Sequence, residues 1–248
     1  ISQGVSGVLC LIYMWKAVPE LKMKKEDWYF NRDIAVKQIS VGIPMGLQYS
    51  ITAIGTMMVQ SSLNILGSYA VAAFTAGNKI ECIFTQAFVA IGTTISTYNA
   101  QNIGAGKLDR VRQGFRATDV IGCAYAVIAG FILFFAGKYF SYLFISDNAD
   151  VVIPMVDTYL RCVGMFLVPL YVVNCYRNGF QGMGYGLLPM LSGVAELVGR
   201  GVMAVIAANK KSYTMACMAS PFAWVVATVL LIVLYFYVMK DMKKKLCL

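Results

Sequence analysis

The sequence contains no histidine, and only 13% of its 248 residues are charged. The absence of histidine excludes Ser-His-Asp triads, histidine-ligated metal sites and acid–base catalysis by imidazole. Soluble domains carry about 25% charged residues, roughly twice the fraction found here. The seven cysteines form no C-x-x-C pair and most lie in apolar runs, so neither a disulfide framework nor a cysteine metal site is expected. We therefore expect a protein that is not an enzyme and that needs no metal or cofactor.

Long apolar runs dominate what is present, with 59% hydrophobic residues and a mean hydropathy of +0.67. Apolar segments of about 20 residues are long enough to cross the hydrocarbon core of a bilayer. We predict an all-α, polytopic membrane protein whose residues 38–239 form a six-helix transmembrane bundle. The expected helices cover residues 36–65, 68–99, 117–137, 152–174, 187–208 and 212–239. A kink is expected at Pro169, because proline interrupts helical hydrogen bonding.

Three segments lie outside this bundle. Residues 1–15 are apolar and end at Trp15, which predicts the end of a transmembrane helix belonging to a missing first lobe. Residues 16–37 mix charges with the aromatic run at 28–30, which predicts an amphipathic interlobe linker on the cytosolic membrane surface; a solvated loop is the alternative. Asn31 is expected to cap the helix that follows it. Residues 240–248 form a basic cytosolic tail.

The basic residues predict an orientation in the membrane. Cations concentrate in the linker, in the stretch 98–114 and Arg116, at Arg177 and in the tail, whereas the opposite loops hold Lys138, Lys210 and Lys211. Cytosolic loops carry the excess of lysine and arginine. We expect a multi-pass protein of the cell membrane with its linker and C-terminus in the cytosol. Because the cations lie in loops between apolar runs, the net charge of +9 predicts no nucleic-acid partner.

Charged residues inside the predicted helices are candidates for function, because each needs a partner or a wet cavity there. Glu81 has no opposite charge three or four residues away, so it is a candidate for binding a coupling H⁺ or Na⁺. Asp157 is a second candidate, although Arg161 can pair with it at a helix end. Glu196 and Arg200 are spaced as a structural ion pair. Polar residues on the same helix faces are candidates for a substrate cavity: Gln48, Thr52, Asn78, Thr85 and Tyr171.

Four motifs in order resemble those of the MATE (multidrug and toxic compound extrusion) transporters. Gly42-x-Pro44 and residues 64–73 resemble the first helix of a MATE lobe and the start of the second. The run at 101–107 resembles the signature Gly-Gln-Asn-x-Gly-Ala through Gln101, Asn102, Gly104 and Ala105, with Ala100 in place of the leading glycine. Residues 177–184 resemble the turn between the fourth and fifth helices.

The resemblance implies a fold and an activity. MATE transporters have twelve helices in two lobes, and they export amphipathic, often cationic compounds in exchange for Na⁺ or H⁺. The chain would be the second lobe, and its partners would be membrane lipid, a small amphipathic substrate and the missing first lobe. In the sodium-coupled branch a glutamate in the first helix of this lobe helps to bind the cation, but residues 36–65 contain no acid. Coupling would then use Glu81, Asp157 or an aspartate of the first lobe.

Alternatives to a drug antiporter stay open. A lipid-linked oligosaccharide flippase of the same superfamily would tend to have a more cationic cavity, and few cations lie within the predicted helices. A membrane enzyme is disfavoured because no histidine, metal motif or nucleophile elbow is present. A chain that represents half of a transporter could also be an inactive fragment.

Overall fold

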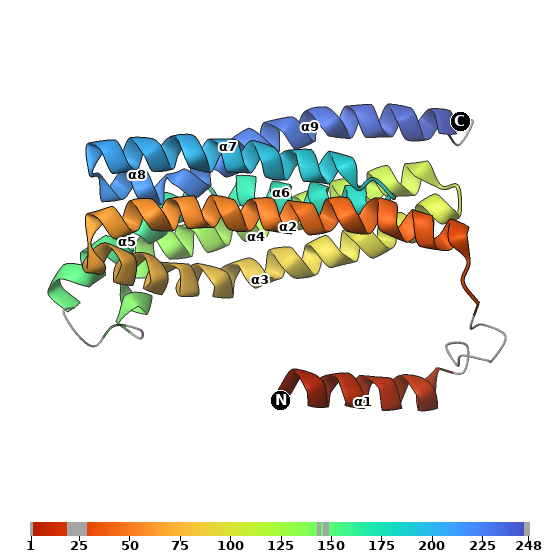
Figure 1. The fold of residues 1–248 in the computed structure, drawn as a ribbon, viewed down its shortest axis with the longest axis horizontal. Coiled ribbons are helices and arrows are strands. Elements are labelled where there is room, and N and C mark those ends of the chain that lie inside the picture. Colours follow the sequence, from red (N-terminus) through yellow and green to blue (C-terminus); the bar gives the residue numbers. More distant parts are fainter. Residues whose placement is uncertain (1, 19–28, 143–144, 146–148, 246–248) are drawn as a thin grey trace. The chain divides into compact units, whose positions relative to one another are not determined.

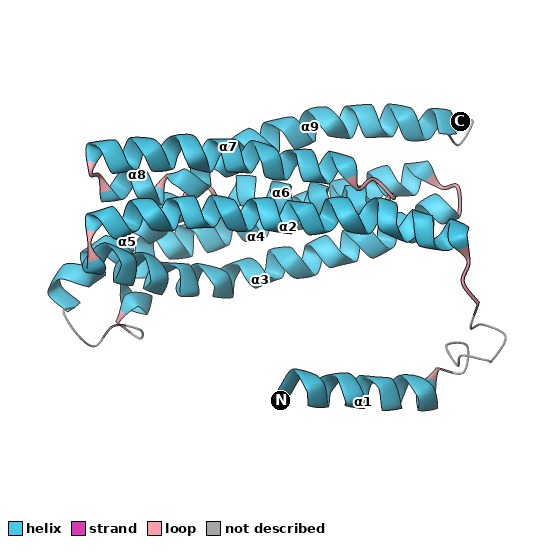
Figure 2. Ribbon diagram, viewed as in Figure 1, coloured by secondary structure: helices cyan, strands magenta, loops and turns pink. Residues whose placement is uncertain are grey.

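The structure, a computed structural model, describes residues 2–18, 29–142, 145 and 149–245. These residues form α-helices joined by short turns, and no strand occurs among them (Figure 2). In chain order the helices are α1 (Ser2–Ala17), α2 (Arg32–Leu66), α3 (Ser68–Gly104), α4 (Leu108–Ser141), α5 (Ala149–Gly164), α6 (Leu167–Gly182), α7 (Leu187–Lys210), α8 (Tyr213–Cys217) and α9 (Ala219–Lys245). The chain divides into two units, residues 1–39 and residues 40–248.

The second unit is a bundle of long helices (Figure 1). Helices α3, α4 and α7 and the α8–α9 segment are each long and apolar enough to cross a membrane, and α5 with α6 makes a fifth crossing if the bent pair is one span. At 35 residues α2 also has the length of a span, but polar residues such as Gln48, Ser50 and Gln60 lower its hydropathy. The prediction of an all-α, polytopic membrane bundle is confirmed, with four or five of its helical segments meeting the length and hydropathy of a membrane span among the described residues.

The signature stretch is more helical than we expected. Helix α3 continues to Gly104 and α4 begins at Leu108, so only three residues connect them. The amide of Asn102 donates to the carbonyl of Tyr98 in its own helix, which lets a polar residue extend an apolar helix. Gly106 then reverses the chain at a φ of 69°, and the N–H of Lys107 donates to the carbonyl of Asn102 at 2.8 Å. The motif is thus the capped end of α3.

The fourth predicted segment is a broken span, as its proline indicated. Helices α5 and α6 meet at an angle of 54°. Pro169 has no N–H to donate to the carbonyl of Met165, so the helix is interrupted at Met165 and Phe166. Just before the break α5 touches α4, where a Cβ added to Gly130 would lie 2.5 Å from the carbonyl oxygen of Gly164. The two glycines therefore allow backbone contact between these helices.

The ends of the described chain also differ from the predicted boundaries. Residues 19–28 of the predicted linker lie outside the described residues, and α2 begins at Arg32, within the range assigned to that linker. The side-chain oxygen of Asn31 accepts the N–H groups of Asp33 and Ile34, so the predicted cap is present. At the other end α9 extends through Lys245, into the segment expected to be a tail.

Candidate functional site

A polar cavity lies inside the helical bundle of residues 40–248. Its volume is about 240 Å³, and its walls come from α2, α3, α5, α6, α7 and α9. Its polar lining includes Asn78, Glu81, Tyr159, Asn174 and Arg200. A larger hollow of about 330 Å³, between α4 and the α5–α6 break, is apolar and presents no comparable chemistry.

Glu81 is a buried carboxylate on the wall of this cavity, with 7% of its surface exposed. The hydroxyl of Tyr159 donates a hydrogen bond to Glu81 Oε2, and the amide of Asn78 donates to the same hydroxyl at 3.4 Å. Tyr159 reaches Glu81 because Gly77 has no side chain: a Cβ there would lie 2.4 Å from the ring. The ring of Phe74 packs edge-on against the ring of Tyr159, with ring centroids 4.8 Å apart. Glu81 is thus held by residues of α3 and α5.

A second buried carboxylate, Glu196, lies between two arginines. Arg177 on α6 donates from its Nη2 to Glu196 at 2.9 Å and from its Nε to the hydroxyl of Ser192 at 3.0 Å. Arg200, one turn beyond Glu196 on α7, lies 3.5 Å from its other oxygen. Arg200 also donates to the carbonyl of Thr52 on α2 at 3.4 Å. These bonds join α2, α6 and α7.

Arg200 connects this network to the cavity. Its side chain lines the cavity that Glu81 faces, and the two opposite charges interact electrostatically. No ion pair within 4.0 Å joins Arg200 to Glu81 in the described part of the chain. The four groups Arg177, Arg200, Glu196 and Glu81 sum to zero charge when Glu81 is ionised. When Glu81 loses its charge, the four groups carry a net positive charge. Arg200 is the positive group among them that lines the cavity.

The structure brings some of the predicted site residues together and separates others. Asn78 and Thr85 line the cavity with Glu81, although the hydroxyl of Thr85 donates to the carbonyls of Glu81 and Cys82 in its own helix. The Thr52 carbonyl contacts Arg200 from outside the cavity lining. Glu196 and Arg200 are in contact as their spacing predicted, and their structural role stays a prediction.

Gln48, Tyr171 and Asp157 lie away from the cavity lining. Gln48 is buried, and its side-chain oxygen accepts the amide of Gln181 at 3.3 Å. Tyr171 is fully buried and donates to the carbonyl of Thr118 on α4. Asp157 pairs with Arg161 at 2.9 Å, and that arginine is half exposed. Tyr171 lies away from the cavity because the regular helical spacing from which its position was predicted does not continue across the α5–α6 break.

Sequence reasoning missed several residues of the site, among them Arg177, Asn174 and Tyr159. Arg177 follows an apolar run and precedes a glycine-rich motif, so we assigned it to a turn, but it lies within α6 with 14% of its side chain exposed. Asn174, one turn before Arg177, faces the cavity and shares its helical spacing, which was an available signal. Tyr159 gave no signal, because its contact with Glu81 spans 78 residues of sequence.

The fold and the cavity define a class of protein: a membrane-embedded helical bundle with a buried carboxylate facing a polar cavity. The sequence profile of the family described as MatE matches residues 44–206, and the chain belongs to that family. The probable multidrug resistance protein YpnP of Bacillus subtilis (strain 168) is 28% identical over 193 residues, which are 77% of this chain and 42% of that protein.

Solved transporters share the fold. A multidrug resistance MATE family transporter of the MOP superfamily, in an outward-facing conformation, superposes with a TM-score of 0.85 at 19% identity, over 94% of this chain and 53% of that one. A MOP superfamily transporter from Pyrococcus furiosus Vc1 (DSM3638) gives 0.84 at 20% identity, over 94% and 54%. The chain thus spans about half the length of these transporters and 42% of the Bacillus protein.

Proposed function

We propose that this chain is one lobe of a secondary active antiporter that exports amphipathic, often cationic compounds in exchange for a coupling cation. Membership of the MatE family and similarity to a probable multidrug resistance protein support this activity. The observation that carries the mechanism is the buried carboxylate of Glu81, which faces a polar cavity inside the bundle. A carboxylate in such a place can hold a proton or a cation, but not both at once.

We propose H⁺ rather than Na⁺ as the coupling ion. Glu81 is the one carboxylate among the described residues that line the cavity, and a single carboxyl group is enough to carry a proton. The positive charge of Arg200 opposes the binding of either cation, so the choice of H⁺ rests on the single carboxyl group and on its hydrogen bond to Tyr159. Tyr159 donates to the ionised form of Glu81, and its hydroxyl can accept from the protonated form.

Antiport then follows from competition for a single charge. Ionised Glu81 attracts the cationic group of the substrate from one side of the membrane. Protonation of Glu81 on the other side removes that attraction, and the substrate leaves. The cavity holds only about 240 Å³, so this lobe would contact the cationic group while a facing lobe encloses the rest of the compound.

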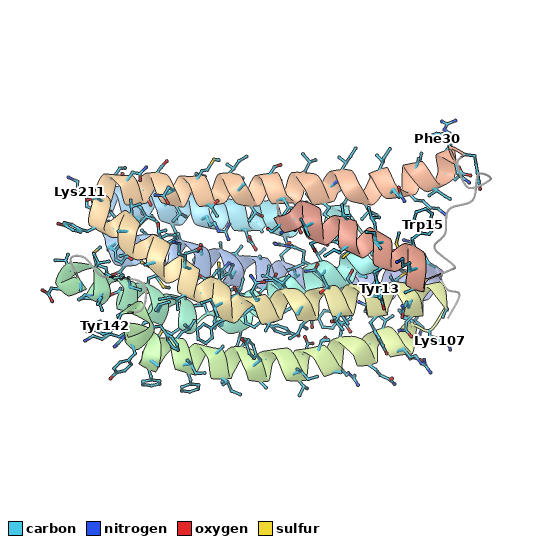
Figure 3. All side chains as sticks on the ribbon, turned by 90° about the horizontal axis from the view of Figure 1, so that it is seen from below. Tyr13, Trp15, Phe30, Lys107, Tyr142 and Lys211 are labelled. Carbon is cyan, nitrogen blue, oxygen red and sulfur yellow. The ribbon has the colours of Figure 1, made fainter. Side chains whose placement is uncertain are left out.

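The proposed orientation places the α3–α4 turn in the cytosol. Lys107 marks that turn at one end of the bundle, and Lys211 and Tyr142 mark the opposite end (Figure 3). The cations near Lys107 outnumber those near Lys211 in the sequence, which supports a cytosolic position for the first end. Membrane lipid around the bundle and a facing first lobe are the proposed partners, and the plasma membrane is the proposed location.

Transport by the complete two-lobed protein tests the proposal. The protein is reconstituted in vesicles, and ethidium movement is driven by an imposed pH gradient or, separately, by an imposed Na⁺ gradient. We expect the pH gradient to drive transport and Glu81→Gln to abolish it, while the control Asp157→Asn, outside the cavity lining, keeps it. Wild-type rate and pH dependence in the Glu81→Gln variant would rule out the role of Glu81, and transport driven by Na⁺ alone would rule out H⁺.

A further inference from the structure

Arg200 has fewer hydrogen bonds than a buried guanidinium needs. The residue is 6% exposed, yet its two hydrogen-bonding contacts, to Glu196 and to the Thr52 carbonyl, are long at 3.5 and 3.4 Å. Its Nε–H has no partner in the described part of the chain. Arginine offers five N–H donors, and an unpaired donor in a buried place is costly. Arg177, by contrast, donates to Glu196 at 2.9 Å and to Ser192 at 3.0 Å, so it is the closer partner of Glu196.

The same side chain forms part of the cavity wall. Asn78 and Asn174 add amide groups to that wall, and Ser220 adds a hydroxyl. Each amide keeps one N–H beyond the bond that it makes, Asn78 to the Tyr159 hydroxyl and Asn174 to the Leu170 carbonyl, so these groups can still donate to an oxygen-rich anionic group. Trp224 closes the wall with an apolar surface. A buried cation with spare donors, amides and an apolar side fits the acidic end of an amphipathic compound.

We propose that this cavity binds an anionic group, of the carboxylate type, at Arg200, and that binding requires Glu81 to be uncharged. The charged groups facing Arg200 set this condition. Glu196 on α7 is shared with Arg177 on α6, and Glu81 on α3 is the remaining negative charge. Ionised Glu81 repels an anion in the cavity, whereas protonated Glu81 leaves Arg200 opposed only by Glu196, whose charge is shared with Arg177. The site goes beyond the export of cations, because it assigns an acidic group to compounds that bind here.

Trp224 reports on this site directly, because it lines the same cavity. Trp15, Trp28 and any tryptophan elsewhere in the full-length protein are replaced by phenylalanine, so that Trp224 is the single source of indole fluorescence. Iodide is an anionic quencher, and acrylamide is a neutral one that measures access alone. In this background we expect iodide to quench Trp224, more strongly at low pH. Arg200→Gln should weaken iodide association about tenfold, the ratio expected for the loss of a charge-assisted hydrogen bond, without changing acrylamide quenching.

Glu81→Gln is the second variant and leaves Arg200 in place. It should strengthen iodide quenching and remove its pH dependence. Protection of Trp224 by benzoate but not by benzyl alcohol or chloride would identify the ligand as the carboxylate of an organic compound, and equal protection by chloride would identify a free inorganic anion. Iodide quenching that is unchanged by both Arg200→Gln and Glu81→Gln would overturn the proposal. These measurements do not involve transport, so their failure is separable from a failure of the antiport mechanism.

Discussion

Arg177 provides a direct test of the buried network, because its replacement removes two short hydrogen bonds. Arg177→Met breaks the contacts of 2.9 Å with Glu196 and 3.0 Å with Ser192. Removing one partner of a buried ion pair costs about 3–5 kcal/mol. Arg200 still lies 3.5 Å from Glu196 and compensates part of its charge, so we expect a loss near the lower end, about 3 kcal/mol.

The matched control is Arg112→Met, the same substitution at an exposed pair. Arg112 lies 3.4 Å from Asp109, and the two side chains are 42% and 90% exposed. An exposed pair contributes at most about 1 kcal/mol, so the two variants should differ by about 2 kcal/mol. The assay is the free energy of unfolding, measured by titrating detergent micelles of the protein with a denaturing detergent and following helicity. A loss for Arg177→Met no larger than for Arg112→Met would refute the argument that burial strengthens this network.

A double-mutant cycle separates the pair from the individual side chains. Arg177→Met combined with Glu196→Gln should cost less than the sum of the two single variants, by about 1 kcal/mol or more, because each single variant leaves one partner uncompensated. Additive losses would show that Arg177 acts through packing rather than through Glu196.

Three further predictions concern the fold and its orientation. Gly130→Val should destabilise the bundle by about 3 kcal/mol, because the new Cβ would lie 2.5 Å from the Gly164 carbonyl; Gly42→Val, with no atom within 4 Å, should cost little, and equal losses would contradict the α4–α5 contact. Burial and a hydrogen bond to Asp241 raise the pKa of Tyr185 to about 12. The contribution of this tyrosine to the free energy of unfolding should therefore be present below pH 10 and be lost between pH 10 and 12. The free energy of unfolding of Tyr185→Phe should not show this loss. In a cysteine-free background, Lys107→Cys should react with an impermeant maleimide only from the cytosol and Lys211→Cys only from outside, and labelling of both from one side would refute the orientation.

Much of the fold could be predicted from the sequence, because apolar runs of membrane length are local signals. The six segments were found, and Pro169 indicated the break at Met165. Helix ends were placed less well. Asn102 continues α3 by bonding within its own helix, so a polar stretch that looked like a loop is largely helical. The sequence shows which residues are polar, but it does not show which groups they form hydrogen bonds with.

The site was only partly predictable, because it depends on contacts between distant residues. Glu81 stood out as a carboxylate without a partner on its own helix, and it does face a polar cavity. Its bond to Tyr159 links residues 78 positions apart and left no local pattern. The pairing of Arg177 with Glu196 required the turn between α6 and α7, which sets no sequence spacing. Tyr171 does not line this cavity, because the break between α5 and α6 interrupts the regular helical spacing on which its prediction was based.

The central claim is that Glu81 exchanges a proton for the cationic end of the substrate. The most direct measurement is the number of protons released when ethidium binds to the purified two-lobed protein in weakly buffered solution with a pH indicator. We expect the wild type to release protons on binding and the Glu81→Gln variant to bind without releasing any, while Asp157→Asn behaves as the wild type. Equal proton release by the wild type and the Glu81→Gln variant would contradict the account.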